Sequence, residues 1–129
     1  MQVITGTNFE LVGDFMEAMD QEVLSYPTFP EEHIQRLRVD LIEEELDELQ
    51  LGIDNQNIIE IADALTDLLY VVYGAGHAFG IDIDECFKEV HKSNMSKLGE
   101  DGRPIKREDG KVLKPDTYFP PDLKSVLSI

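Results

Sequence analysis

Two short acidic segments hold the residues with the clearest chemical potential in this sequence of 129 residues. The first runs from Glu44 to Glu48, and the second runs from Glu60 to Asp63, with Asp67 one helical turn later. Both lie in stretches whose apolar residues repeat with a helical period. Burying ionised carboxylates near one another is costly unless cations compensate for their charge. The spacing therefore predicts a site for a hard divalent ion, Mg²⁺ or Mn²⁺, held by carboxylate oxygens.

The position of each carboxylate around the first helix follows from a rotation of about 100° per residue. Relative to Ile34, Glu45 falls at about 20° and Glu48 at about 320°, which places both inside the apolar arc. Glu44 lies at the edge of that arc, near 280°. The remaining acids of this segment fall on the opposite, solvent side: Asp40, Glu43 and Asp47.

The acids of the second segment also share one side of their helix. Glu60, Asp63 and Asp67 occupy a stripe about 60° wide. Further along, the same stripe continues through Val71 and Gly74, as a buried face would. Two interpretations stay open: inward ligands of a metal, or acidic helix faces that interrupt a core. The first is favoured, because Arg36 and Arg38 are too few to neutralise five carboxylates.

Composition limits the classes of partner. The formal net charge is −16, which argues against nucleic acid or an anionic membrane as a partner. The only cysteine, Cys86, excludes an internal disulfide and fits a reducing compartment. The segment Met1–Leu11 lacks a signal-peptide pattern, and no apolar run is long enough to cross a bilayer, so we expect a cytoplasmic protein.

The apolar periodicity predicts an all-α fold, a four-helix bundle followed by a short β-hairpin and an extended tail. We expect a single domain with a helical core over about residues 7–98 and a basic tail over about residues 99–129. Asp109-Gly110 predicts a type I′ turn between the two hairpin strands. The helices are expected over Thr7–Leu24, Thr28–Leu51, Asn57–Phe79 and Asp82–Lys97. Thr28 with Glu31 resembles a capping box, Gly52 is expected to stop the second helix, and the segment Asp54–Asn57 is expected to cap the third.

The third expected helix is apolar on most of its surface, so three neighbouring helices give it little cover. We therefore expect a second copy of the chain to pack against it, in a homodimer or a dimer of dimers.

Inward carboxylates on neighbouring helices serve two kinds of metal chemistry. Di-iron redox sites in helical bundles use a Glu-x-x-His motif, which does not occur in this sequence. Phosphoryl chemistry instead uses divalent ions that neutralise developing charge. It also explains the uneven charge: residues 1–87 hold 20 acids and 2 arginines, whereas residues 88–129 hold 9 basic and 7 acidic residues. A polyphosphate substrate needs the cations of that second part.

The pattern Glu44-Glu45-x-x-Glu48, followed by Glu60-x-x-Asp63, resembles the signature of the all-α nucleotide pyrophosphohydrolases. This superfamily includes MazG-like enzymes, dimeric dUTPases and phosphoribosyl-ATP pyrophosphohydrolases. The segment 89–97 and the glycine- and lysine-rich tail are similar to parts of MazG-like proteins, so that the resemblance covers about residues 28–121.

The resemblance implies hydrolysis of a nucleoside triphosphate between its α- and β-phosphates, which yields a nucleoside monophosphate and pyrophosphate. Glu45 would orient or deprotonate the attacking water. The implied metal ligands are Glu44, Glu45, Glu48, Glu60 and Asp63, with Asp67 as an additional candidate, and the implied substrate contacts are Asn94, Lys97, Lys111 and Lys114.

The preferred substrate stays open between a canonical or modified nucleoside triphosphate, in a house-cleaning or pool-control role, and phosphoribosyl-ATP. Phe15, Met19 and Tyr70 are candidates for a specificity pocket. An alternative of another class is an acidic helical interaction module without catalytic activity.

Overall fold

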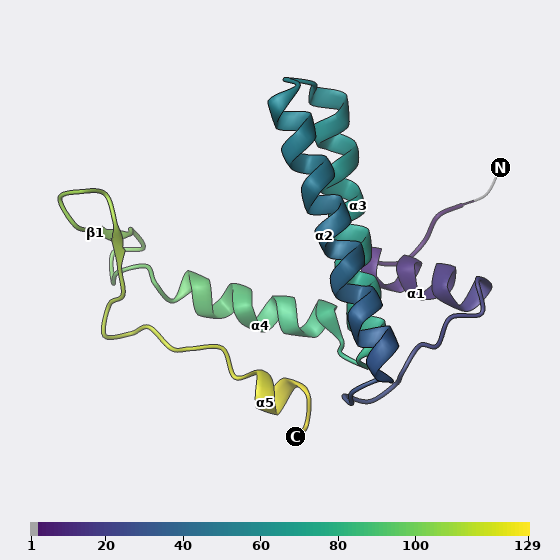
Figure 1. The fold of residues 1–129 in the computed structure, drawn as a ribbon. Coiled ribbons are helices and arrows are strands. Elements are labelled where there is room, and N and C mark those ends of the chain that lie inside the picture. The colour runs from purple at the N-terminus through teal and green to yellow at the C-terminus, as the bar shows by residue number, and fades with distance from the viewer. Residues whose placement is uncertain (1–2) are drawn as a thin grey trace. The chain divides into compact units, whose positions relative to one another are not determined.

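A computed structural model describes residues 3–129, so the first two residues of the Met1–Leu11 segment lie outside it. The structure divides into two compact units, one up to Ile83 and one from Asp84 onward. The first is mainly helical, and the second combines two helices with a two-stranded antiparallel sheet and extended segments, which confirms the predicted all-α class with a short hairpin (Figure 1). The elements are α1 (Asn8–Ala18), α2 (Glu32–Asp54), α3 (Ile58–Ala78), α4 (Ile83–Met95), β1 (Ile105–Lys106), β2 (Val112–Leu113) and α5 (Leu123–Val126).

In the first unit, α2 and α3 form a long antiparallel hairpin, and α1 packs against α3 near one end of it (Figure 1). The buried apolar side chains of this unit include Val12 and Met16, which line a pocket formed by all three helices, and also Ala64 and Ala78 of α3. The opposite end of the hairpin consists of α2 and α3 alone. Large apolar side chains there stay exposed on both helices, among them Leu51 and Ile58.

Helix α1 begins as predicted but ends before the expected boundary at Leu24. The Thr7 hydroxyl accepts a hydrogen bond from the Glu10 amide, and the Glu10 carboxylate accepts one from the Thr7 amide, which forms a capping box. At the other end Asp20 adopts a left-handed conformation with φ 57°. The Gln21 amide then donates to the Met16 carbonyl at 2.8 Å. This Schellman motif ends the helix without a glycine, which the sequence pattern did not indicate.

Helix α2 is shifted relative to its predicted span of Thr28–Leu51. The proposed capping box at Thr28 is wrong, because the N-cap is Glu31 and makes no side-chain capping bond. The predicted stop at Gly52 is also wrong, since α2 continues to Asp54. A β-carbon at Gly52 would lie 3.1 Å from the Ile61 backbone nitrogen. The glycine therefore permits a close approach of α3 rather than ending α2.

The boundaries of α3 and α4 lie close to those predicted. The Asn57 side chain accepts hydrogen bonds from the amides of Ile59 and Glu60, as the expected cap of α3. Gly80, with φ 68°, ends α3 in a second Schellman motif. No helix within residues 3–129 has the length and hydropathy required to span a membrane.

An aromatic contact fixes α1 against α3. The ring of His77 on α3 is buried and stacks on Phe9 of α1, with centroids 3.8 Å apart and planes 7° apart. The Nε2 atom of His77 lies 2.7 Å from the Phe9 carbonyl oxygen, and it must donate because a carbonyl only accepts. Stacking and hydrogen bonding together fix the orientation of the imidazole.

In the second unit, the extended tail is tied to α4 by serine hydroxyls. The buried Ser93 donates to the Phe119 carbonyl at 2.8 Å, and the Phe119 amide donates to the Ser96 hydroxyl at 3.1 Å. The strands pair in the register Ile105 with Leu113 and Lys106 with Val112.

The predicted type I′ hairpin turn is wrong. Such a turn needs positive φ at two consecutive residues, whereas Gly110 has φ 90° and Asp109 is not among the residues with positive φ. The Gly110 amide donates to the Arg107 carbonyl, and the Arg107 amide donates to the Lys111 carbonyl. This pattern is that of a longer loop with a glycine bulge, which adds one residue to the turn.

Candidate active site

The α2–α3 hairpin brings carboxylates from both helices together. Glu45 and Glu48 lie three residues apart on α2, and they face Asp67 on α3. One oxygen atom from each of these three side chains lies within 4.8 Å of the other two. Mg²⁺ holds its ligands at about 2.0–2.1 Å, so oxygens on opposite sides of the ion are about 4 Å apart. The three carboxylates are therefore close enough to share one divalent ion after a small adjustment.

The electrostatics of this cluster follow from burial and from like charge. Glu45 is half-buried, and its Oε2 atom is buried without a hydrogen-bond partner. Burial raises the pKa of Glu45, and the neighbouring charges of Glu48 and Asp67 raise it further. The pKa of Asp67 is raised for the same reasons, first by burial and then by Asp63. No ion pair among residues 3–129 involves these carboxylates, so a cation from outside the chain would stabilise them.

A second group of acids continues the cluster toward the α2–α3 connection. Glu48, Glu60 and Asp63 line a pocket of about 180 Å³ with Leu51. Asn55 donates a long hydrogen bond of 3.4 Å to Glu60. Since Glu48 belongs to both groups, the carboxylates form one continuous acidic band.

The predicted ligands differ in how the structure places them. Glu45, Glu48 and Asp67 come together, and Glu60 and Asp63 lie beside them. Glu44 is exposed and belongs to neither group, so its role as a ligand stays a prediction. Glu48 is exposed rather than buried, because this end of the hairpin is not covered by α1. The acids predicted to face solvent are all exposed: Asp40, Glu43 and Asp47.

The predicted substrate contacts lie in the second unit, and their role stays a prediction. Asn94 is an exposed residue of α4, and Lys97 follows the end of that helix. Lys111 precedes β2 and is exposed. Lys114 lies 4.7 Å from the ring centroid of Tyr118, in a cation–π contact.

One charged residue near the site was missed by the sequence analysis. Arg38 on α2 is buried, and it lines a pocket of about 250 Å³ together with Phe15 and Tyr70. The burial of Arg38 could have been predicted from the sequence, because position 38 falls at about 40° relative to Ile34, inside the apolar arc of α2. Among the specificity candidates, Phe15 and Tyr70 line this pocket, whereas Met19 is exposed outside it.

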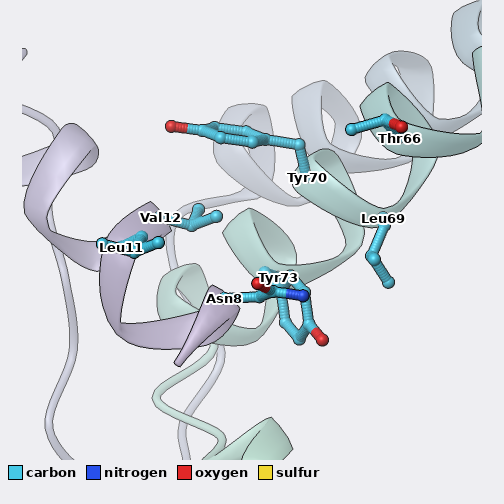
Figure 2. A pocket seen from close by; sticks show the side chains of 7 residues that line it. All are labelled: Asn8, Leu11, Val12, Thr66, Leu69, Tyr70 and Tyr73. Carbon is cyan, nitrogen blue, oxygen red and sulfur yellow. The ribbon is translucent and has the colours of Figure 1, made fainter. Parts of the chain in front are cut away.

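A smaller pocket of about 140 Å³ lies between α1 and α3 (Figure 2). Tyr70 extends from α3 toward α1, above Val12, and these two residues also line the pocket of Arg38. The lining of the smaller pocket is mostly apolar and contains no ionisable group other than tyrosine. It lacks the charged groups that would fix a polar ligand.

Comparison with known proteins agrees with this geometry. A viral relative, "Uncharacterized protein L479" of Acanthamoeba polyphaga mimivirus, is 37% identical over 102 residues. The aligned part is 76% of this chain but only 38% of the viral protein, so the chain spans well under half of that relative. The model of the phosphoribosyl-ATP pyrophosphohydrolase (PRA-PH) family matches residues 12–94, which include every carboxylate of the acidic band. The chain therefore belongs to the phosphoribosyl-ATP pyrophosphohydrolase family.

Proposed function

We propose that this protein is a metal-dependent nucleoside triphosphate pyrophosphohydrolase that releases a nucleoside monophosphate and pyrophosphate. The observation that carries the proposal is the convergence of Glu45, Glu48 and Asp67 around a buried, unpartnered carboxylate oxygen. Membership of the phosphoribosyl-ATP pyrophosphohydrolase family supports a pyrophosphohydrolase type of reaction.

The donor set fits Mg²⁺ or Mn²⁺. It consists of carboxylate oxygens alone, which hard divalent ions prefer, and the Oε2 atom of Glu45 lacks a partner that such an ion would supply. Glu45, Glu48 and Asp67 would hold the ion, with Asp63 and Glu60 beside them. When bound, a divalent ion supplies positive charge to phosphate oxygens and increases the acidity of water.

Glu45 is the proposed general base. Its raised pKa makes it a stronger base than an ordinary carboxylate, and its half-buried position keeps it close to the other acids. The water oxygen would form a bond to the α-phosphorus as the bond from that phosphorus to the bridging oxygen breaks. Glu45 accepts the proton of the water, and pyrophosphate departs with the bonding electron pair.

Asn94, Lys97, Lys111 and Lys114 are the proposed contacts of the polyphosphate. The excess of basic over acidic residues after position 87 supports this role, because the acidic part of the chain holds only two arginines. The family match ends at residue 94, so the three lysines lie beyond it.

A product assay tests the proposal. The protein is incubated with ribo- and deoxyribonucleoside triphosphates and with phosphoribosyl-ATP, and the products are separated by chromatography. We expect monophosphate and pyrophosphate in the presence of Mg²⁺ or Mn²⁺ and no turnover in excess EDTA. Release of orthophosphate would contradict the reaction. Metal binding without any turnover would identify a non-catalytic acidic interaction module instead.

A further inference from the structure

We infer that Arg38 and Gln21 recognise the base of the nucleotide and select bases that carry a carbonyl oxygen, rather than an amino group, at position 4 of a pyrimidine or position 6 of a purine. The inference rests on the proposed function and names its substrate class: nucleotides of uracil, thymine or guanine rather than of adenine or cytosine.

The first observation is the incomplete hydrogen bonding of a buried cation. Arg38 is only 8% exposed, and its Nε atom is buried without a partner. Its one hydrogen bond within residues 3–129 runs from Nη2 to Oε1 of Gln21 and is long, at 3.5 Å. No carboxylate among these residues pairs with it. A buried charge normally has its hydrogen bonds satisfied, so this guanidinium is set to receive acceptors from a ligand.

The second observation is the pocket that the guanidinium lines. Phe15 and Tyr70 stand at its wall as an edge-to-face pair, with centroids 5.6 Å apart and planes at 80°. Both rings are partly exposed, at 43% and 39%. The volume of about 250 Å³ is below the range of about 300–1,000 Å³ that encloses whole drug-sized ligands. The pocket therefore suits a single flat ring system, with aromatic walls and a polar end.

Gly74 of α3 provides the space for the guanidinium. A β-carbon at this position would lie 2.7 Å from the Nη1 atom of Arg38. The location of the charge thus depends on two helices: α2 carries the arginine, and α3 has a glycine where a side chain would collide with it.

The pocket and the acidic cluster share one face of the hairpin. Arg38 precedes Glu45 by seven residues on α2, and Gly74 follows Asp67 by seven residues on α3. Seven residues make about two turns, a rise of about 10 Å with almost no change of face. Because α2 and α3 are antiparallel, both displacements point in the same direction (Figure 1). A nucleotide with its base beside Arg38 would extend its sugar and phosphates toward the carboxylates.

The hydrogen-bonding character of the two polar groups decides which base fits. Arginine has donors only, and the Gln21 oxygen already accepts from it, which leaves the Gln21 amide group as a donor. The polar end of the pocket therefore presents donors to the ligand. The carbonyl oxygens of uracil and thymine, and the O6 and N7 atoms of guanine, are acceptors. The amino groups of adenine and cytosine would place a donor against these donors.

The test measures base preference in the full-length protein with Mg²⁺. kcat/KM is determined for GTP and UTP and for ATP and CTP, in the wild type and in Arg38→Met. We expect the wild type to prefer GTP and UTP over ATP and CTP, and the ratio of their kcat/KM values to fall by about 10- to 100-fold in the variant, the range that one good base contact supplies. Arg36→Met is the matched control, because Arg36 is an exposed neighbour paired with Glu32, and its ratio should equal that of the wild type.

Gln21→Glu keeps the test valid if Arg38→Met does not fold. Gln21 is exposed, and a carboxylate there would pair with Arg38 and occupy its donors. We expect this variant to lose the base preference and to melt at a higher temperature than the wild type. An unchanged preference in Gln21→Glu would overturn the inference, as would an equal loss for all four substrates in Arg38→Met, which indicates a phosphate contact or a structural role.

Binding separates failure of this inference from failure of the proposed reaction. If no triphosphate is hydrolysed, Kd values for GMP and UMP are compared with those for AMP and CMP by calorimetry. A preference for the first pair that disappears in Gln21→Glu supports base recognition, even though the proposed reaction has failed. Equal affinities, or no binding, overturn it. Hydrolysis of all four triphosphates at equal rates would retain the reaction and reject the selectivity.

Discussion

The imidazole of His77 on α3 fills the space beside Gly13 on α1 that a β-carbon would occupy. A β-carbon at position 13 would lie 2.8 Å from Cε1 of His77. The ring cannot move away easily, because it stacks on Phe9 and is hydrogen-bonded to the Phe9 carbonyl. This contact sets how closely α1 and α3 pack, and α1 supplies part of the pocket around Arg38.

Gly13→Ala should therefore destabilise the protein. Alanine favours a helix over glycine by about 1 kcal/mol, but overpacking a fixed site costs about 1–3 kcal/mol. We expect a net fall in the melting temperature, measured by circular dichroism. Asp14→Ala, at the next and exposed position of α1, should not lower it. A melting temperature equal to or above that of the wild type would show that the His77 ring can rearrange.

Glu45→Gln and Glu48→Gln should abolish most of the activity. Loss of a general base or of a charged ligand is expected to reduce kcat by about 10²–10⁴-fold. The controls are Glu43→Gln and Asp47→Asn, which remove a charge from the exposed side of the same helix and should retain activity. Equal losses for Glu43→Gln and Glu45→Gln would show that the acidic cluster is not the site of the reaction.

The raised pKa of Glu45 predicts how pH affects stability without metal. A carboxyl whose pKa is higher in the folded state than its ordinary value of 4.5 contributes stability in its protonated form, and this contribution is lost as pH rises through the raised pKa. In EDTA at pH 7, Glu45→Gln should therefore melt at a higher temperature than the wild type. The difference should shrink as pH falls toward about 4.5, and melting curves over this range would reveal it.

Divalent metal should reverse the order of the two melting temperatures, so that the wild type melts above Glu45→Gln. An ion that binds the ionised cluster stabilises the folded state by about 2.7 kcal/mol at 100 times its Kd. We expect Mg²⁺ or Mn²⁺ to raise the melting temperature of the wild type at pH 7 and to raise that of Glu45→Gln much less. Equal shifts in both proteins would place the metal elsewhere.

An exposed apolar face on α3 predicts self-association. Leu65 and Leu69 are 52% and 46% exposed, one turn apart on this helix. Burying such residues against a second copy would remove apolar surface from water. Leu65→Lys should therefore shift the protein toward monomer in sedimentation velocity, whereas Lys88→Ala, on the exposed surface of α4, should not. A wild type that sediments as a monomer would reject the expected homodimer.

Helical periodicity was sufficient to predict which acidic side chains of α2 and α3 lie together. The helical period placed Glu45 on the apolar side of α2 and placed Glu43 and Asp47 on its solvent side. On α3 it placed Asp63 and Asp67 on the same side. These predictions succeeded because side-chain direction in a helix depends only on residue number. Glu48 shows the limit, since its burial depends on whether a third helix covers that end of the hairpin.

The errors occur where a tertiary contact overrides a local signal. Glycine is typical of the position just after a helix end, but Gly52 lies within α2 and allows α3 to pack closely against it. Asp20 ends α1 in a left-handed conformation that glycine would normally adopt. The contact of Gln21 with Arg38 follows from that turn, so the sequence alone did not reveal it.

The connection between α2 and α3 is short, and the acidic band and the pocket of Arg38 draw on different segments of the chain. Only three residues separate the two helices that carry the acidic band, so the proposed metal ligands lie in one contiguous stretch of the chain. The pocket of Arg38 also needs α1, which lies earlier in the chain and carries no acid of that band. Under the proposed function, substitutions in α1 would change the preferred nucleotide during evolution and leave the proposed metal ligands unchanged.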